Sequence, residues 1–440
     1  MVTRLAVWAL LKGRDMTKHE ILELPGCGCE DAPQTKSLLP VSEALQQIRQ
    51  ATGRISELEE LPVDETLGRV LGRDVQAQIM MPPFDNSAMD GYALRRDDCP
   101  QEGPFRLPVV QRIAAGQAAQ APLEPGTCTR IFTGAPIPAG ADTVVMQEQV
   151  QLAGGMAVFD RAPSEGQNIR RAGEDVALGD VIVPAGQVIT TRELAAITGA
   201  GLTKVQVVRK LRIAVICTGS ELARAGETLD PGQIYDVNGP MLKSAVAAIG
   251  AELVHQSECP DTKQALAAAM VDASEIADLV ITTGGVSVGE EDHVHAAIVQ
   301  VGGQLKFAGV AIKPGKPLSF GRIGQALFLG LPGNPVAAFV TWTLFAKPLC
   351  HRLSGATDGL RTARLVRADT PLQHTTGRCE YRPATIVGRD DQGREVVHLG
   401  PQVHSAQLAP LVGCDGLVRL PGDVKELPLG SMLEFLPFEG

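Results

Sequence analysis

One part of the chain alternates regularly between apolar strands and helices. Residues 213–218 are apolar and rich in β-branched side chains, which predicts a strand buried on both faces of a parallel sheet. A helix is predicted from Asn238, as its capping residue, to Gly250, and Asp261 is expected to cap a second helix. Residues 278–283 form the next predicted strand. Strands joined through helices build βαβ units, so this part is predicted to be a three-layer α/β domain with a mostly parallel sheet.

The strand that ends at Thr283 runs into a glycine-rich turn, and three carboxylates follow at Glu290, Glu291 and Asp292. A strand, a glycine turn and a helix start together direct backbone N–H groups at an anion, usually a phosphate. The carboxylates would repel a phosphate unless a divalent cation lay between them, and hard oxygen ligands suit Mg2+. The stretch therefore predicts a metal-assisted phosphate site. Its candidate anion-contacting residues are Gly284, Gly285, Ser287 and Gly289.

Ligands of open α/β sheets bind beyond the carboxyl ends of the strands. Three acids are expected along that edge: Glu221, Asp261 and Asp292. Carboxylates gathered at one edge favour a divalent cation more strongly than any one of them alone. These three residues are therefore the predicted Mg2+ ligands.

Two proline-containing loops are predicted to reach the same edge. Lys313 and Lys316 lie in the run Lys-Pro-Gly-Lys-Pro, where they would offer positive charge to a phosphate or an oxyanion. The alternative is a pair of solvated lysines on a surface turn. Pro332 and Pro335 fix the backbone of the second loop, and Pro335 suits the first turn of a helix.

Polar residues also gather in three motifs of the N-terminal half. Asp85 lies between two prolines and a predicted strand, which fits a surface loop and a held functional loop equally well. Thr133 could offer a hydroxyl to a phosphate, although a turn residue is the simpler interpretation. Arg170 and Arg171 precede Asp175, as a surface ion-pair cluster or as an anion-binding arginine pair.

Composition narrows the class of partner. The 440 residues carry a formal net charge of −10, and only 4% of them are aromatic, which argues against nucleic acid and anionic membranes. Nine cysteines, mostly isolated in apolar surroundings, fit reduced thiols better than a disulfide framework. Since no apolar run reaches the length of a transmembrane helix, we expect a cytoplasmic protein.

The pattern changes again near residue 361. Short alternating segments separated by Gly, Asp or Pro predict a small all-β module. The predicted strands cover residues 363–369, 379–388, 394–399, 416–421 and 431–437.

Five motifs, in order along residues 38–440, strongly resemble the molybdopterin molybdenumtransferases. These are the MoeA-like proteins, which are similar to the E domain of gephyrin. The motifs are Phe84-Asp-Asn-Ser-Ala-Met-Asp-Gly-Tyr-Ala93, Phe132-Thr-Gly-Ala-Pro136, Thr283-Gly-Gly-Val-Ser-Val-Gly289, Lys313-Pro-Gly-Lys-Pro317 and Leu331-Pro-Gly-Asn-Pro335.

The resemblance implies insertion of molybdenum from molybdate into adenylylated molybdopterin, with Mg2+ and release of AMP. It implies a homodimer with its site between subunits, and molybdoenzymes or their chaperones as possible partners. It also implies a multidomain α/β and β protein. Its four expected domains are a discontinuous linking domain (38–82 plus 173–209), a β-rich inserted domain (83–172), an α/β molybdopterin-binding domain (210–358) and a C-terminal β-barrel (361–440). Residues 1–37 show no sustained periodicity and are predicted to form a mobile tail.

Carried over by position, Asp85, Thr133, Glu221 and Asp292 become the expected catalytic residues. The expected substrate-binding residues are Asp175, Asp261, Gly284, Gly285, Ser287, Gly289, Lys313, Lys316, Pro332 and Pro335. The chain departs from the family at Gly309, where a basic residue is usual, and at the stretch around Ser405, where the family's Gly-Ser-His run is absent.

The sequence is compatible with two other functions. One is the preceding adenylylation of molybdopterin by an enzyme of the same α/β fold, but the Asp85 and Thr133 motifs lie outside that domain. The other is a non-catalytic scaffold that binds cofactor or partner proteins. The acids at Glu221, Asp261 and Asp292 favour the molybdenum transferase over a scaffold.

Overall fold

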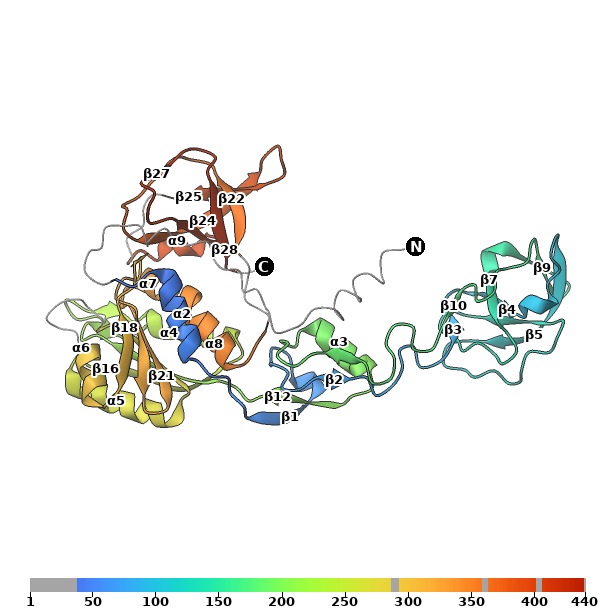
Figure 1. Cartoon of the computed structure of the whole chain (residues 1–440), viewed down its shortest axis with the longest axis horizontal. Helices are drawn as coiled ribbons and strands as arrows, with labels where there is room; N and C mark the ends of the chain where they lie inside the picture. Colours follow the sequence, from blue (N-terminus) through green and yellow to red (C-terminus); the bar gives the residue numbers. More distant parts are fainter. Residues whose placement is uncertain (1–37, 286–292, 358–362, 401–405, 439–440) are drawn as a thin grey trace. The chain divides into compact units, whose positions relative to one another are not determined.

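A computed structural model describes residues 38–285, 293–357, 363–400 and 406–438. The chain divides into two compact units (Figure 1). Unit 1 contains the described residues up to Glu57 and those from Arg209 onward, and unit 2 spans Leu58–Val208. No helix in these described ranges is long and apolar enough to cross a membrane. The finer five-part division stays a prediction.

Unit 1 is built around a six-stranded sheet of which four strands are parallel. The buried strand that ends at Thr218 lies between two parallel neighbours. A third parallel pairing follows, and the last two strands of the sheet are joined to it by antiparallel pairings. This confirms the predicted mostly parallel sheet. Its order is β16 (Glu252–Cys259), β13 (Arg212–Thr218), β17 (Leu279–Thr283), β21 (Ala326–Leu331), β20 (Ser319–Ile323) and β18 (Gln304–Ala308).

Helices cover both faces of this sheet, because alternate residues of each strand point to opposite sides. Ile213, Val215 and Cys217 of β13 pack into one apolar core, and Ala214 and Ile216 pack into the other. The first core is covered by α2 (Val41–Ala51), α4 (Asn238–Ala248), α7 (Pro335–Thr341) and α8 (Lys347–Leu353). The second is covered by α5 (Lys263–Ile276) and α6 (His293–Gln300). The predicted three-layer domain is confirmed.

Both predicted helix caps are wrong by one or two residues. Helix α5 is capped by Thr262, whose side chain accepts a hydrogen bond from the Ala265 N–H at 3.3 Å, and not by Asp261. At α4 the side chain of Asp236 accepts from the N–H groups of Asn238 and Gly239 at 3.0 Å each. Asn238 is buried inside the first helical turn, so its amide is free for contacts with the strand ends.

The C-terminal part of unit 1 is a closed five-stranded barrel. Its strands are β24 (Cys379–Arg389), β25 (Glu395–Leu399), β22 (Arg364–Ala368), β28 (Met432–Pro437) and β26 (Gly416–Leu420). The last strand pairs back with the first and closes the barrel. Val366, Val397, Val418 and Phe435 fill it. The predicted β-module is confirmed, with strand ends within one residue of those expected.

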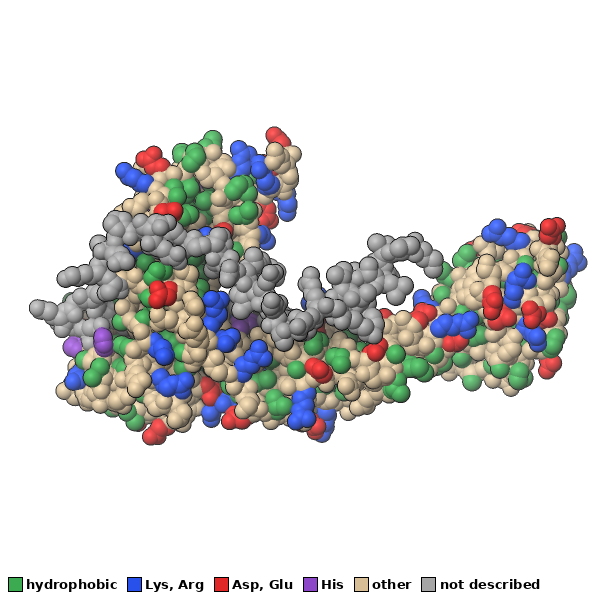
Figure 2. All heavy atoms as spheres, viewed as in Figure 1, with side chains coloured by type: hydrophobic (Ala, Val, Ile, Leu, Met, Phe, Trp, Pro, Cys, Tyr) green, Lys and Arg blue, Asp and Glu red, His purple; other side chains and the backbone are tan. Residues whose placement is uncertain are grey.

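Unit 2 is rich in β-structure, as predicted. Its main sheet has the order β7 (Thr143–Met146), β4 (Gly91–Leu94), β6 (Cys128–Ile131), β5 (Phe105–Ile113), β9 (Met156–Phe159) and β8 (Val150–Ala153). Shorter ladders join β1 (Leu58–Pro62) to β12 (Lys204–Val208), β2 (Val75–Gln76) to β11 (Val181–Val183), and β3 (Asn86–Ser87) to β10 (Ile169–Arg170). Helix α3 (Thr191–Gly199) begins with a capping box between Thr190 and Glu193. On the face in Figure 2, acidic and basic side chains are interspersed.

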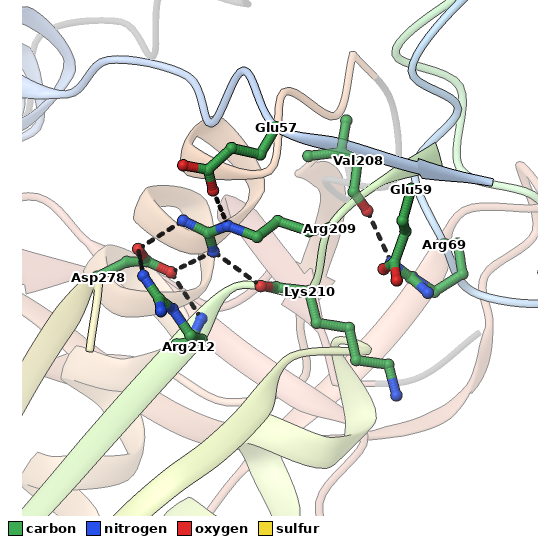
Figure 3. Close-up of polar contacts among 8 residues, drawn as sticks. All are labelled: Glu57, Glu59, Arg69, Val208, Arg209, Lys210, Arg212 and Asp278. Carbon is green, nitrogen blue, oxygen red and sulfur yellow. Dashed lines mark hydrogen bonds and ion pairs between the residues drawn. The ribbon is translucent and has the colours of Figure 1, made fainter. Parts of the chain in front are cut away.

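Arginines hold the chain where it passes from one unit to the other (Figure 3). In unit 1, Arg209 donates to both carboxylate oxygens of Asp278 at 2.7 and 2.9 Å, and it also pairs with Glu57. The Arg212 N–H adds a hydrogen bond to Asp278 at 2.8 Å. Burial alone would raise the pKa of Asp278, but the hydrogen bonds from the two arginines outweigh it, so this pKa is lowered. Within unit 2, Arg69 donates to the Val208 carbonyl at 2.7 Å.

Candidate active site

The carboxyl ends of two neighbouring parallel strands, β17 and β21, are tied together by one buried amide. The side chain of Asn238 donates to the Thr283 hydroxyl at 2.8 Å and to the Gly333 carbonyl at 2.6 Å. Thr283 in turn donates to the Pro332 carbonyl at 3.1 Å. The turn after β21 is therefore held against the end of β17, and Pro335 starts α7 just beyond it.

The glycines of the predicted turn are needed because backbones approach closely. Gly284 has a φ of 94°, and a Cβ there would lie 2.1 Å from the Thr218 carbonyl oxygen. At Gly333 a Cβ would lie 3.2 Å from the Gly284 Cα. Gly285 has a φ of 61°. Gly284 is buried and Gly285 is half-buried, so the turn packs closely against the end of β13, and only glycine fits at both positions. A glycine turn at a strand end is the kind of backbone that binds anions.

Two of the three predicted metal ligands flank this turn. The Thr218 hydroxyl donates to Asp261 at 3.3 Å, and a Cβ on Gly285 would lie 3.1 Å from that carboxylate. The Glu221 carboxylate lies over Gly219, where a Cβ would meet it at 2.8 Å. Both carboxylates thus sit at the end of β13.

These two carboxylates fit Mg2+ in chemistry, since hard carboxylate oxygens are its usual protein ligands. Glu221 is exposed and Asp261 half-buried, so a cation could reach both. Among the described ranges, no group of three or more His, Cys, Asp or Glu side chains is close enough to hold a metal ion. Asp292, the third predicted ligand, lies outside the described residues, as do Ser287 and Gly289.

The predicted lysine loop forms a short strand, β19 (Ile312–Lys313), which pairs with β24 of the barrel. The Lys313 ammonium lies 3.4 Å from a carboxylate oxygen of Glu380, so Lys313 is not a free surface lysine. Lys316 is half-buried, and its carbonyl accepts from the Val310 N–H at 2.9 Å. Gly309, where the family is usually basic, adopts a φ of 95°. A Cβ placed on Gly309 would lie 3.0 Å from the Leu38 side chain.

In unit 2 the structure brings together the three motifs of the N-terminal half. Asp85 forms an ion pair with Arg171 at 2.7 Å and accepts from the Ala172 N–H at 2.8 Å. The Asp85 carbonyl accepts from the Ile137 N–H at 2.9 Å, which joins this loop to the one that follows Thr133. The Ala172 hydrogen bond, followed by that of Arg171, holds the pKa of Asp85 below its usual value.

Thr133 is held by an acid of the first motif. Its N–H and its hydroxyl donate to the same Asp90 oxygen at 2.8 and 2.9 Å. These hydrogen bonds, first from the N–H and then from the hydroxyl, lower the pKa of Asp90. Asp175 is exposed, and its N–H donates to the Met81 carbonyl at 3.1 Å. The Asp85 and Thr133 loops thus form one cluster, while the Asp175 side chain is not among its described contacts.

Sequence reasoning missed three residues that hold these contacts: Asp90, Asn238 and Glu380. Arg171 was singled out as an ion-pair or anion-binding residue, but its partner Asp85 was not predicted. Asp90 lay in a motif that was recognised, and its acid character was the available signal. Asn238 was interpreted only as a helix cap. Nothing local in the sequence pointed to Glu380, because its partner is far away in the chain.

Comparisons with known proteins agree with this fold. Residues 39–201 match the MoeA N-terminal region (domain I and II), and residues 214–352 match a probable molybdopterin binding domain. A molybdopterin biosynthesis MoeA protein from Pyrococcus horikoshii superposes with a TM-score of 0.80 at 28% identity, over 91% of this chain and 100% of that chain. The fold and these matches therefore define a MoeA-like protein.

Curated relatives identify the family more closely. The chain is 37% identical over 382 residues to molybdopterin molybdenumtransferase 2 of Mycobacterium tuberculosis, covering 85% of this chain and 93% of the relative. It is 40% identical over 319 residues to molybdopterin molybdenumtransferase of Haemophilus influenzae, covering 72% of this chain and 78% of the relative. The chain belongs to the molybdopterin molybdenumtransferase family. The predicted family, and with it the predicted class of transferase in molybdenum cofactor biosynthesis, is confirmed.

Proposed function

We propose that this protein transfers molybdenum from molybdate to adenylylated molybdopterin and releases AMP, with Mg2+ as its metal. The observation that carries the proposal is the glycine turn packed between the ends of β13 and β17, with the carboxylates of Glu221 and Asp261 at the end of β13. A nucleotide-linked pterin offers a pyrophosphate, and a turn of this kind supplies N–H donors to such an anion.

Each cluster has a chemical task in this reaction. Backbone N–H groups at Gly284 and Gly285 hold the pyrophosphate, and Lys313 supplies positive charge to the molybdate oxyanion. Glu221 and Asp261 would hold Mg2+, which when bound lowers the charge repulsion against attack at the adenylyl linkage. Molybdenum is carried to the dithiolene sulfurs of the substrate itself, so the reaction needs no protein cysteine.

The loops of unit 2 complete the site in this proposal. Asp85 and Thr133 are fixed by Arg171 and Asp90, so their side chains present a preorganised polar surface. We place this surface at the site of a second subunit, in a homodimer whose two sites are shared between subunits. Cross-complementation tests this arrangement: a mixture of Asp85→Asn and Asp261→Asn chains should recover part of the activity that each homodimer lacks.

The decisive experiment supplies adenylylated molybdopterin and Mg2+ to the full chain, with and without molybdate, and follows AMP release. Molybdate-stimulated release is the expected result, and its absence would overturn the proposal. Two control reactions identify the other functions. Pyrophosphate release from ATP and molybdopterin would indicate the adenylylation step. Tight binding of the adenylylated substrate without turnover would indicate a scaffold.

A further inference from the structure

The loop that carries Lys313 is joined to the C-terminal barrel by a two-residue parallel ladder. In that ladder Ile312 is the partner of Cys379, and Lys313 is the partner of Glu380. The Cys379 N–H donates to the Ala311 carbonyl at 3.0 Å. This register places a motif lysine of the α/β domain level with an acid of the barrel.

Glu380 is a buried carboxylate shared between cations. Its side chain is only 4% exposed. One carboxylate oxygen accepts from the Arg382 Nε at 2.7 Å, and the other lies 3.4 Å from the Lys313 Nζ and 3.8 Å from the His374 Nδ1. Burial lowers the pKa of His374, which favours its neutral ring. Glu380 therefore faces two permanent charges, Lys313 and Arg382.

The two cations differ in what they can still bind. The Arg382 side chain is 8% exposed and also donates to the Gln373 carbonyl at 2.8 Å, whereas the Lys313 side chain is 26% exposed. An ammonium group has three donors, and Glu380 engages one side of it. Lys313 is thus held by a buried anchor while part of its ammonium group remains open to a ligand.

We propose that Glu380 is a positioning residue that fixes the Lys313 ammonium group for binding of the molybdate oxyanion. The proposal rests on the proposed function, in which Lys313 binds molybdate. The direction in which molybdate affinity changes when Glu380 is removed separates this proposal from simple electrostatics. If Glu380 acted only through its negative charge, its removal would strengthen anion binding. If Glu380 positions Lys313, its removal weakens anion binding, because a mobile ammonium group must be ordered by the ligand.

The test compares Glu380→Gln and Glu380→Asp with the control Glu434→Gln. Glu434 has a similar role elsewhere in the barrel, since it pairs with Arg419 at 2.9 Å and its side chain is 17% exposed. Molybdate binding is measured by calorimetry, and KM for molybdate and kcat are measured from AMP release. We expect Glu380→Gln to raise both Kd and KM for molybdate roughly tenfold, as for loss of one charged hydrogen bond, with little change in kcat. Glu380→Asp should recover part of this loss, and Glu434→Gln should match the wild type.

A double-mutant cycle with Lys313→Ala separates positioning from a structural role. Once Lys313 is removed, Glu380→Gln should have no further effect on molybdate affinity. The proposal is overturned if Glu380→Gln binds molybdate as tightly as the wild type or more tightly. It is also overturned if the loss persists without Lys313. Should Glu380→Gln fail to fold, Glu380→Asp decides by the same two criteria.

The outcome for the wild type distinguishes the two proposals. Molybdate binding without molybdate-stimulated AMP release overturns the proposed function, while the binding data still judge the role of Glu380. A wild-type chain that does not bind molybdate overturns both.

Discussion

Asp85 and Arg171 lie 86 positions apart in the chain, and their side chains meet at 2.7 Å. This ion pair joins two motifs that sequence reasoning could only treat separately. It also fixes the charge of Asp85, because the Ala172 N–H and Arg171 together hold its pKa below its usual value. Asp85 is therefore an ionised hydrogen-bond acceptor at neutral pH, which limits the chemical roles open to it.

The first prediction concerns this carboxylate. Asp85→Asn should lower molybdate-stimulated AMP release by at least about 100-fold, the lower range for a positioned acid or base. Its thermal midpoint should stay within about 3 °C of the wild type, since exposed ion pairs contribute at most about 1 kcal/mol. The control is Asp74→Asn, which makes the same change at an aspartate of unit 2 that also accepts a backbone N–H, from Ala185. Equal activity of the two variants would contradict a role for Asp85 in the reaction.

The closeness of backbones at the strand ends leads to the second prediction. Gly284→Ala should be more destabilising than Gly302→Ala, although both glycines have a positive φ. A Cβ at Gly284 would lie 2.1 Å from the Thr218 carbonyl oxygen, whereas nothing lies within 4 Å of one at Gly302. Each variant carries roughly 1 kcal/mol or more of left-handed strain, and only Gly284→Ala adds a clash of about 1–3 kcal/mol. Urea unfolding measures the difference in stability between the two variants. Equal midpoints would show that the turn at Gly284 shifts away from Thr218 without cost.

Asn238 provides the third prediction. Asn238→Ala removes the two hydrogen bonds to Thr283 and Gly333 inside a buried turn. Loss of a buried polar partner typically costs about 1–3 kcal/mol, so the urea midpoint should fall by a corresponding amount. Asn238→Asp is the matched control, because a carboxylate cannot donate to the Gly333 carbonyl and should be no better than alanine. A midpoint for Asn238→Ala like that of the wild type would mean that the amide does not hold the turn.

Much of the fold followed from local patterns. The strand ending at Thr218 and the five barrel strands were predictable because hydrophobic periodicity and turn residues are local signals. The helix caps were not. Asparagine is a common capping residue, but the Asn238 amide is used by Thr283 and Gly333, and the side chain of Asp236 accepts the capping hydrogen bonds instead. Tertiary contacts decided between two residues that are equally suitable locally.

The candidate site was predictable only in part, for a related reason. Asp261 meets the glycine turn, and Glu221 lies over Gly219 at the end of the neighbouring strand, because parallel strands end at one edge, which is a rule of topology. The partners of Lys313 and Asp85 depend instead on long-range pairing. Glu380 reaches Lys313 through the register of one short ladder, and no local pattern specifies that register.

The pH dependence of stability gives the fourth prediction. The folded-state pKa of Asp278 is lowered, so its ion pairs with Arg209 and Arg212 contribute stability above its unfolded pKa of about 3.9. That contribution is lost as the pH falls through the folded-state pKa. Asp278→Asn should therefore be less stable than the wild type by about 1–3 kcal/mol at pH 7. The two unfolding free energies should converge as the pH falls below about 3.9. A difference that stays constant down to acid pH would show that the charge of Asp278 is not what stabilises the folded state.

The fifth prediction tests the metal ligands by the concentration of Mg2+ that the reaction needs. Asp261→Asn keeps an oxygen that can accept from the Thr218 hydroxyl, so the local fold should survive, but it removes the charge that attracts a hard cation. We expect the Mg2+ concentration for half-maximal AMP release to rise by roughly tenfold or more, with partial recovery at high Mg2+. Glu258→Gln is the control, because Glu258 lies near the end of the neighbouring strand β16 and pairs with Arg224 at 2.9 Å. Since that pair already satisfies Glu258, its loss should leave the Mg2+ requirement unchanged. If both variants shift the requirement equally, the acids act through the general negative charge of this edge, and Asp261 is not a specific ligand.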